Sequence, residues 1–232
     1  MSGIEESLDQ LGRDWDIDPV LRGFILGRVT DVSDRQVRVG RVVFHIPYLR
    51  GHDRHVLWGC RWPDCDNCCK KQGRLPLTSS DMITIGSGLK YKSRSEFLRS
   101  EALIATHAEP GPGSGSVVMT TVNLKRMEGE TEADDGTRVP CRFLGGDGAC
   151  TLHPGRPGVC YMYPFSAWIE SEGGMARVHA SYQFDGCCPG FYLDRGTDPM
   201  RDVLAEYSGI IHGYVMDAER TARESLSSVS IA

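Results

Sequence analysis

Residues 55–71 read HVLWGCRWPDCDNCCKK and place four cysteines within ten positions, at Cys60, Cys65, Cys68 and Cys69. Cysteines that only pack in a core need no such neighbours. Two thiolates one turn apart can reach the same cation with little loop-closure entropy, and the cation keeps both sulfurs deprotonated. Cys65-x2-Cys68 meets this requirement, and the Asp-Asn dipeptide between these cysteines suits a tight turn. The spacing therefore predicts a metal site in this segment.

The adjacent pair Cys68-Cys69 poses a geometric problem for a single ion. In an extended strand, neighbouring side chains point to opposite faces, so one ion would not hold both sulfurs. Either the chain turns sharply at this point, or the second sulfur serves another role, such as a second site or a polynuclear cluster.

Five further cysteines follow in two segments. Cys141, Cys150 and Cys160 lie in PCRFLGGDGACTLHPGRPGVCYMYPF (140–165), and Cys187-Cys188 lie in GCCPG (186–190). The glycine-rich stretch FLGGDGAC predicts a turn that brings Cys141 and Cys150 together. A closed zinc site takes four ligands and an ordinary iron–sulfur cluster takes four cysteines, so nine cysteines could fill one centre or two.

Spacing alone does not select the metal. Cys60-x4-Cys65-x2-Cys68 matches the spacing of plant-type ferredoxins, but the glycine- and serine-rich loop of a ferredoxin is absent. Zinc accepts the same cysteines equally well.

Five sequence elements carry a more specific resemblance. They are Cys65-Asp66-Asn67-Cys68-Cys69, Cys141-Arg142-Phe143-Leu144, the segment from Cys150 to Cys160 with its internal Arg156-Pro157, Tyr163-Pro164-Phe165, and Cys188-Pro189-Gly190. In order, spacing and flanking residues, over roughly residues 60 to 190, they resemble the YkgJ-like cysteine-cluster family of zinc- or iron-chelating proteins. The chain departs from the family pattern at three places. The Cys60–Cys65 interval is one residue longer, His153 and Tyr161 replace a tyrosine and an arginine, and Cys187 is an extra thiol.

The resemblance implies eight metal-site candidates, not all of which need to touch the same centre: Cys60, Cys65, Cys68, Cys69, Cys141, Cys150, Cys160 and Cys188. A similar cysteine core occurs in the flagellin lysine N-methylases, which are associated with an iron–sulfur cluster and S-adenosylmethionine. Those enzymes are longer, and this chain has no GxGxxG motif for a methyl donor.

Composition sets outer limits on the function. The net charge of −5 and the pI near 5.8 argue against a dedicated nucleic-acid binder, which usually has a basic surplus. The N-terminal MSGIEESLDQLGRDW lacks the basic flank and apolar core of a secretory signal, and no apolar run approaches the ~20 residues that span a bilayer. We expect a cytoplasmic protein without a membrane segment. In a reducing compartment, an odd number of cysteines favours metal or redox chemistry over disulfides.

The surrounding pattern predicts a single α+β domain over residues 1–232, with a cysteine-rich, metal-centred core of short strands and loops at about 60–190. Asp18-Pro19 is typical of a helix start, and RQVRVGRVVFHIPYL predicts a hairpin or a bulged strand around Gly40 that ends at Pro47. Thr78 with Asp81, and Ser93 with Glu96, predict capping boxes. Residues 108–116 predict a flexible loop, and residues 198–226 a long C-terminal helix with a buried stripe.

Other interpretations of the same residues stay open. The cysteines could merely pack or could form disulfides, and no cysteine has a visible base that would make it a nucleophile, so enzymatic activity is undecided. For His153 a surface or capping role is favoured over metal ligation, and His52 and His55 suggest a solvated loop.

Three functions follow, in order of preference. The first is a [4Fe–4S] protein acting in redox or cluster-assisted group transfer. The second is a structural zinc module that supports a protein-interaction surface. The third is an S-adenosylmethionine-dependent protein lysine N-methyltransferase-like enzyme. A protein partner or protein substrate fits all three, and no nucleic acid is expected.

Overall fold

The computed structural model describes residues 3–71, 73–110, 116–126 and 139–229. The fold is α+β, as predicted. Contacts divide the chain into two compact units. Unit 1 consists of Met1–Cys68 and Met162–Val215, and unit 2 of Cys69–Tyr161 and Met216–Ala232. The expectation of a single domain stays a prediction.

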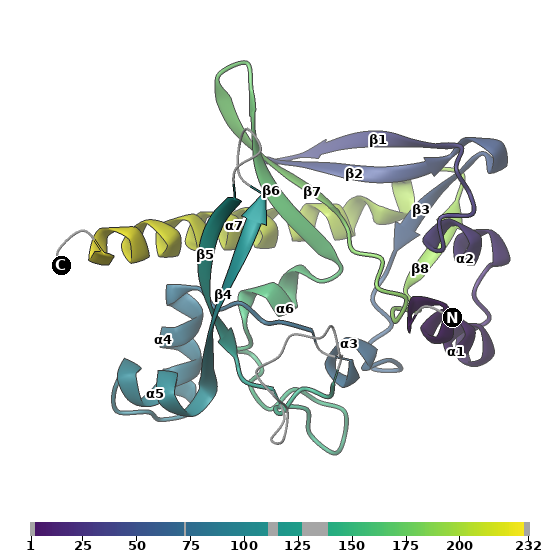
Figure 1. Cartoon of the computed structure of the whole chain (residues 1–232). Coiled ribbons are helices and arrows are strands. Elements are labelled where there is room, and N and C mark those ends of the chain that lie inside the picture. The colour runs from purple at the N-terminus through teal and green to yellow at the C-terminus, as the bar shows by residue number, and fades with distance from the viewer. Residues whose placement is uncertain (1–2, 72, 111–115, 127–138, 230–232) are drawn as a thin grey trace. The chain divides into compact units, whose positions relative to one another are not determined.

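Unit 1 is built on a mixed sheet (Figure 1). Its strands are β1 (Val32–Val39), β2 (Val42–Leu49), β3 (Arg54–Trp58), β6 (Phe165–Glu172), β7 (Met175–Tyr182) and β8 (Phe191–Asp194). Their order is β6-β7-β2-β3-β8, and β1 pairs with β2. The β2–β7 pair is parallel and the other pairs are antiparallel. Segments far apart in the sequence therefore share one sheet.

Of the hairpin and the bulged strand predicted around Gly40, the structure shows the hairpin, with Gly40 in the β1–β2 turn. Gly40 has a φ of +57°, which favours glycine, and a Cβ atom added there would lie 3.0 Å from the Ser208 hydroxyl. The second strand continues past Pro47 to Leu49. Pro47 lies between the part of β2 that pairs with β7 and the part that pairs with β3, so its missing N–H costs no ladder hydrogen bond on that side.

Four helical segments belong wholly to unit 1: α1 (Gly3–Trp15), α2 (Pro19–Ile25), η1 (Arg50–His52) and η3 (Asp198–Met200). The predicted start of α2 is confirmed, because the Asp18 carboxylate accepts from the Val20 N–H at 2.8 Å. The C-terminal helix α7 (Arg201–Val229) begins in this unit. Its buried Leu204 and Ile211 join Phe44 of β2 in one core, which confirms that the apolar stripe is used for packing.

Unit 2 has a smaller core. Its elements are α4 (Ser79–Gly88), α5 (Arg94–Glu101), β4 (Ala102–Pro110), β5 (Ser116–Leu124), most of α6 (Gly158–Met162) and the end of α7 from Met216. The two strands form an antiparallel pair. The core side chains are Leu77, Met82, Ile85, Phe97 and Leu124.

Both predicted helix starts of unit 2 are present, but only one is a complete capping box. Thr78 accepts from the Asp81 N–H at 3.1 Å, and the Asp81 carboxylate accepts from the Thr78 N–H at 2.9 Å. Ser93 accepts from the Glu96 N–H at 3.2 Å, whereas the Glu96 carboxylate accepts from the N–H of Lys92.

The predicted loop 108–116 falls for the most part on residues 111–115, which lie outside the described residues. Its first three positions belong to β4 and its last to β5. Among the helices that are described, none is both long enough and apolar enough to cross a bilayer.

Candidate metal centre

The first cysteine loop of unit 1 leaves the end of β3. Cys60 and Cys68 are exposed, and Cys65 is half-buried. The Cys65 N–H donates to the Arg61 carbonyl at 3.1 Å, and the Asn67 N–H donates to Cys65 Sγ at 3.5 Å. Burial raises the pKa of the Cys65 thiol, the Asn67 N–H opposes this rise, and the nearby thiols of Cys68 and Cys60 add to it. Cys60 and Cys68 thus influence the ionisation of Cys65.

The adjacent pair Cys68-Cys69 lies on a single helical turn, α3 (Asn67–Lys70). In a helix, neighbouring side chains are rotated by about 100° instead of pointing to opposite faces. The chain therefore turns at this pair, and this turn is compatible with either role of the second sulfur. The boundary between the two units falls between these two residues.

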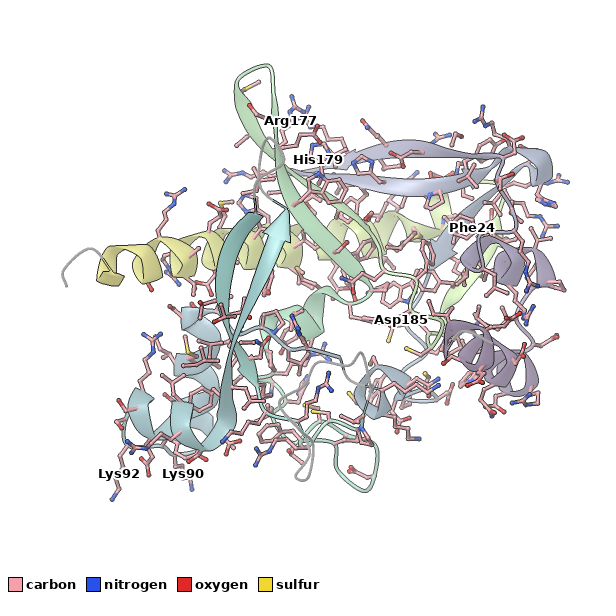
Figure 2. The ribbon with its side chains drawn as sticks, in the orientation of Figure 1. Phe24, Lys90, Lys92, Arg177, His179 and Asp185 are labelled. Carbon is pink, nitrogen blue, oxygen red and sulfur yellow. The ribbon has the colours of Figure 1, made fainter. Side chains whose placement is uncertain are left out.

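The second cysteine loop of unit 1 connects β7 to β8 and is organised by Asp185 (Figure 2). The Asp185 carboxylate accepts from the Cys187 N–H at 3.0 Å and from the Tyr163 hydroxyl, at 3.0 and 3.2 Å to its two oxygens. The Asn67 amide Nδ2 donates to the Cys187 carbonyl at 3.0 Å. This hydrogen bond joins the two cysteine loops of unit 1.

Cys188 has two N–H donors directed at its sulfur. Its Sγ accepts from Trp58 Nε1 at 3.3 Å and from the Gly190 N–H at 3.4 Å. Burial raises the pKa of this thiol to about 11, and the Trp58 and Gly190 donors act in the opposite direction. Gly190 is required here, because a Cβ atom would lie 2.3 Å from the Gly59 carbonyl oxygen. N–H donors aimed at sulfur favour a thiolate, and a bound cation would supply the missing positive charge.

Cys187, the extra thiol, has a different environment. Its side chain is buried, with 1% of its surface exposed, and its Sγ lies 4.0 Å from the Tyr163 hydroxyl. Burial raises the pKa of Tyr163 well above its usual range, and the neighbouring Cys188 and Asp185 add to the rise. Tyr163 is therefore a neutral donor that holds this loop.

The cysteines of unit 2 are tied by backbone contacts. The Cys141 N–H donates to the Cys69 carbonyl at 2.7 Å. Leu144 and Cys150 form an isolated β-bridge, closed by a hydrogen bond from the Gly145 N–H to the Ala149 carbonyl at 2.8 Å. The glycine-rich turn predicted between Cys141 and Cys150 is confirmed.

Cys160 lies on α6, whose start is fixed by Asp81. The carboxylate that completes the α4 capping box also accepts from the Gly158 N–H at 2.8 Å. The guanidinium carbon of Arg156 lies 4.1 Å from the centroid of the Tyr161 ring, as in a cation–π contact. His153 is exposed, and its N–H donates to the Cys150 carbonyl at 3.1 Å, which agrees with the surface role favoured for it.

The eight candidates divide equally between the two units. Cys60, Cys65, Cys68 and Cys188 belong to unit 1, and Cys69, Cys141, Cys150 and Cys160 belong to unit 2. All nine cysteines lie in the described part of the chain, and none forms a disulfide. Within the described residues, no three His, Cys, Asp or Glu side chains are grouped closely enough to hold an ion. The donor set fits zinc or iron, but the sulfurs have to converge when a metal binds.

Three features of this region were not predicted from the sequence. Trp58 reaches Cys188 only because Trp58 pairs with Phe191 in the β3–β8 register. The turn at Asp185 could have been predicted locally, because an aspartate carboxylate often accepts a hydrogen bond from the backbone N–H two residues later. The solvated loop suggested for His55 was wrong: β3 pairs with β2 and β8, so His55 is buried.

Comparison with known proteins gives one family. No curated protein and no solved structure matched the chain. A family model named CxxCxxCC, with the description "putative zinc- or iron-chelating domain", matches residues 59–189. This match covers more than half of the chain and contains all nine cysteines together with the loops described above. The chain belongs to the CxxCxxCC family.

Proposed function

We propose that this protein carries a [4Fe–4S] centre held by cysteine thiolates and used in redox or cluster-assisted group-transfer chemistry. The observation that supports this proposal most is the pair of N–H donors on Cys188 Sγ, from Trp58 and Gly190. Hydrogen bonds to sulfur stabilise the negative charge of metal-bound thiolates and tune the reduction potential of iron–sulfur clusters. A buried thiol that only packed would need neither donor.

The ligand set favoured for the centre comes from unit 1. Cys60, Cys65, Cys68 and Cys188 supply the four sulfurs that an iron–sulfur cluster needs. One further observation supports this set: the Asn67 Nδ2 atom donates to the Cys187 carbonyl at 3.0 Å and so joins the two loops. The four candidates of unit 2 form a set of the same size, which would hold a second ion.

The residues around these sulfurs have assignable tasks. Trp58 and Gly190 donate to Cys188 Sγ, and Asp185 fixes the backbone of the Cys187–Cys188 loop. Burial of the Trp58 ring, which is 3% exposed, keeps water from that side of the sulfur. When bound, such a cluster exchanges single electrons with a partner.

A zinc site is the second candidate. The turn at Cys65-x2-Cys68, in which the Asn67 N–H bonds to Cys65 Sγ, also suits tetrahedral zinc. The protein would then be a structural module that supports a protein-interaction surface. Methyl transfer to a protein lysine is the third possibility; it rests on the similarity to flagellin lysine N-methylases, and the chain has no GxGxxG motif.

Anaerobic purification followed by optical spectroscopy separates these functions. The proposal predicts a brown protein with broad absorbance at about 400 nm that bleaches on reduction. A colourless protein with stoichiometric zinc that unfolds on chelation would overturn the iron–sulfur assignment and support the structural module. Methyl label transferred from S-adenosylmethionine to a protein would support the third function.

A further inference from the structure

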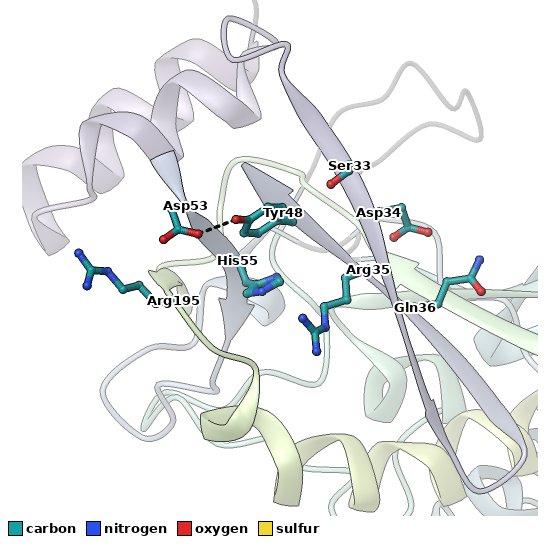
Figure 3. Close-up of a pocket in the computed structure, with 8 residues that line it drawn as sticks. All are labelled: Ser33, Asp34, Arg35, Gln36, Tyr48, Asp53, His55 and Arg195. Carbon is teal, nitrogen blue, oxygen red and sulfur yellow. Dashed lines mark hydrogen bonds between the residues drawn. The ribbon is translucent and has the colours of Figure 1, made fainter. Parts of the chain in front are cut away.

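Unit 1 contains an open cavity of about 620 Å³ that is separate from the cysteine loops (Figure 3). Side chains of β1, β2 and β3, of the residue before β3 and of the residue after β8 line it. The strand register places Ser33 opposite Tyr48, and Tyr48 opposite His55, so these three side chains share one face of the sheet. Arg35 lies two residues from Ser33 on β1 and therefore faces the same way.

His55 is an unusual component of this lining. The residue is only 4% exposed, and the centroid of its ring lies 4.7 Å from the centroid of the Tyr48 ring. Its buried Nδ1 has no hydrogen-bond partner among the described residues. Buried polar groups are rarely left in this state, because the lost hydrogen bond to water is not replaced. A ligand in the cavity, with a small shift of the ring, would supply that partner.

The lining contains two carboxylates and two guanidinium groups, which differ in their contacts. The Asp53 carboxylate accepts from the Tyr48 hydroxyl at 2.5 Å, and the Asp34 carboxylate pairs with His45. By contrast, no described residue forms an ion pair with Arg35 or Arg195. Figure 3 shows these two arginines on either side of His55. The groups left over are two guanidinium groups, which can only donate, and one imidazole nitrogen, which donates when it carries a proton.

We propose that this cavity binds a small organic anion through a carboxylate or phosphate group held by Arg35 and His55, with Arg195 at the rim. A guanidinium group recognises either oxyanion through two parallel hydrogen bonds. The volume lies within the range of small-molecule sites. Nothing in this proposal depends on a metal bound by the cysteines.

Binding of an anion should be coupled to proton uptake. Burial lowers the pKa of His55, Arg35 lowers it further, and Asp53 and Asp194 act in the opposite direction. An anion beside Arg35 would cancel the effect of that arginine, so His55 would gain a proton more readily in the complex. Affinity should therefore increase as the pH falls through the pKa that His55 has in the complex.

The test is isothermal titration calorimetry of the full chain, as purified with its metal, using inorganic phosphate and citrate as separate probes. We expect at least one probe to bind saturably, and its affinity to fall about tenfold or more in Arg35→Gln. Arg38→Gln is the matched control, because Arg38 is exposed on the same strand but does not line the cavity.

Two outcomes would overturn the proposal. One is the absence of saturable binding of either probe up to about 10 mM. The other is an equal loss of affinity in Arg35→Gln and Arg38→Gln, which would show general attraction to a charged surface. A difference between phosphate and citrate identifies the anion class. Metal content, measured on the same samples, is independent of all these results.

Discussion

The indole Nε1 of Trp58 donates a hydrogen bond to Cys188 Sγ at 3.3 Å. Trp58 is the last residue of β3, and Cys188 lies in the loop that leads into β8. The Gly59 N–H also donates to the Gly190 carbonyl at 2.9 Å. Strand pairing in the sheet thus aligns a donor with a sulfur 130 residues away in the sequence.

Replacing Trp58 by phenylalanine removes this donor and keeps an aromatic ring in the core. We expect metal affinity to fall about tenfold, the usual effect of losing a partner of a metal ligand. Competition with a chelator measures the change, and an iron–sulfur centre should also show a shifted reduction potential. Trp168→Phe, at a half-exposed position on β6, is the matched control. Equal metal affinity in the wild type and Trp58→Phe would contradict a role for the hydrogen bond.

The adjacent cysteines at 187 and 188 give a paired test of ligand assignment. Cys188 Sγ accepts two N–H donors, whereas Cys187 Sγ lies in a buried position beside the Tyr163 hydroxyl. Cys188→Ser should lose most of the bound metal, and Cys187→Ser should retain it. Elemental analysis of both variants, with circular dichroism to confirm folding, decides between them. Metal loss in Cys187→Ser alone would show that the two roles are reversed.

The α4 capping box should contribute measurably to the stability of unit 2. Thr78→Val keeps the shape of the side chain and removes the oxygen that accepts from the Asp81 N–H. The free energy of unfolding should fall by about 1 kcal/mol, the usual cost of losing an N-cap. Thr78→Ser retains the oxygen and should lose less. Urea denaturation measures both variants, and a valine variant as stable as the wild type would refute the contribution of the cap.

His55 should make stability depend on pH. Burial, followed by the charge of Arg35, lowers the pKa of His55 below its ordinary value of 6.5. Its contribution to stability is therefore fully present above about pH 6.5 and is lost as the pH falls through the pKa of the folded state. Between about pH 7.5 and 5.5, the wild type should lose more unfolding free energy than His55→Gln, which cannot titrate. Urea denaturation in phosphate-free buffer tests this, and parallel pH profiles would contradict it.

The sequence predicted the features that short stretches determine. Gly40 marked the hairpin, Asp18-Pro19 the start of α2, Thr78 with Asp81 the capping box, and the apolar stripe the packing of α7. Each depends on backbone or side-chain chemistry within a few residues.

Features that depend on pairing between distant strands were not predicted. His55 looked like part of a polar loop, because β3 also pairs with β8, which lies far along the sequence. The contact between Trp58 and Cys188 is hidden for the same reason. The helical turn at Cys68-Cys69 was one of two open alternatives, since a run of four residues is too short for a periodic pattern to show.

The most direct test is the iron and acid-labile sulfide content per chain of protein purified without oxygen. The account predicts about four iron atoms and four sulfides per chain, or about eight of each if the cysteines of unit 2 hold a second cluster. Zinc in place of iron would retain a thiolate metal centre and reject the cluster. A folded protein with no bound metal and nine titratable thiols would contradict the account.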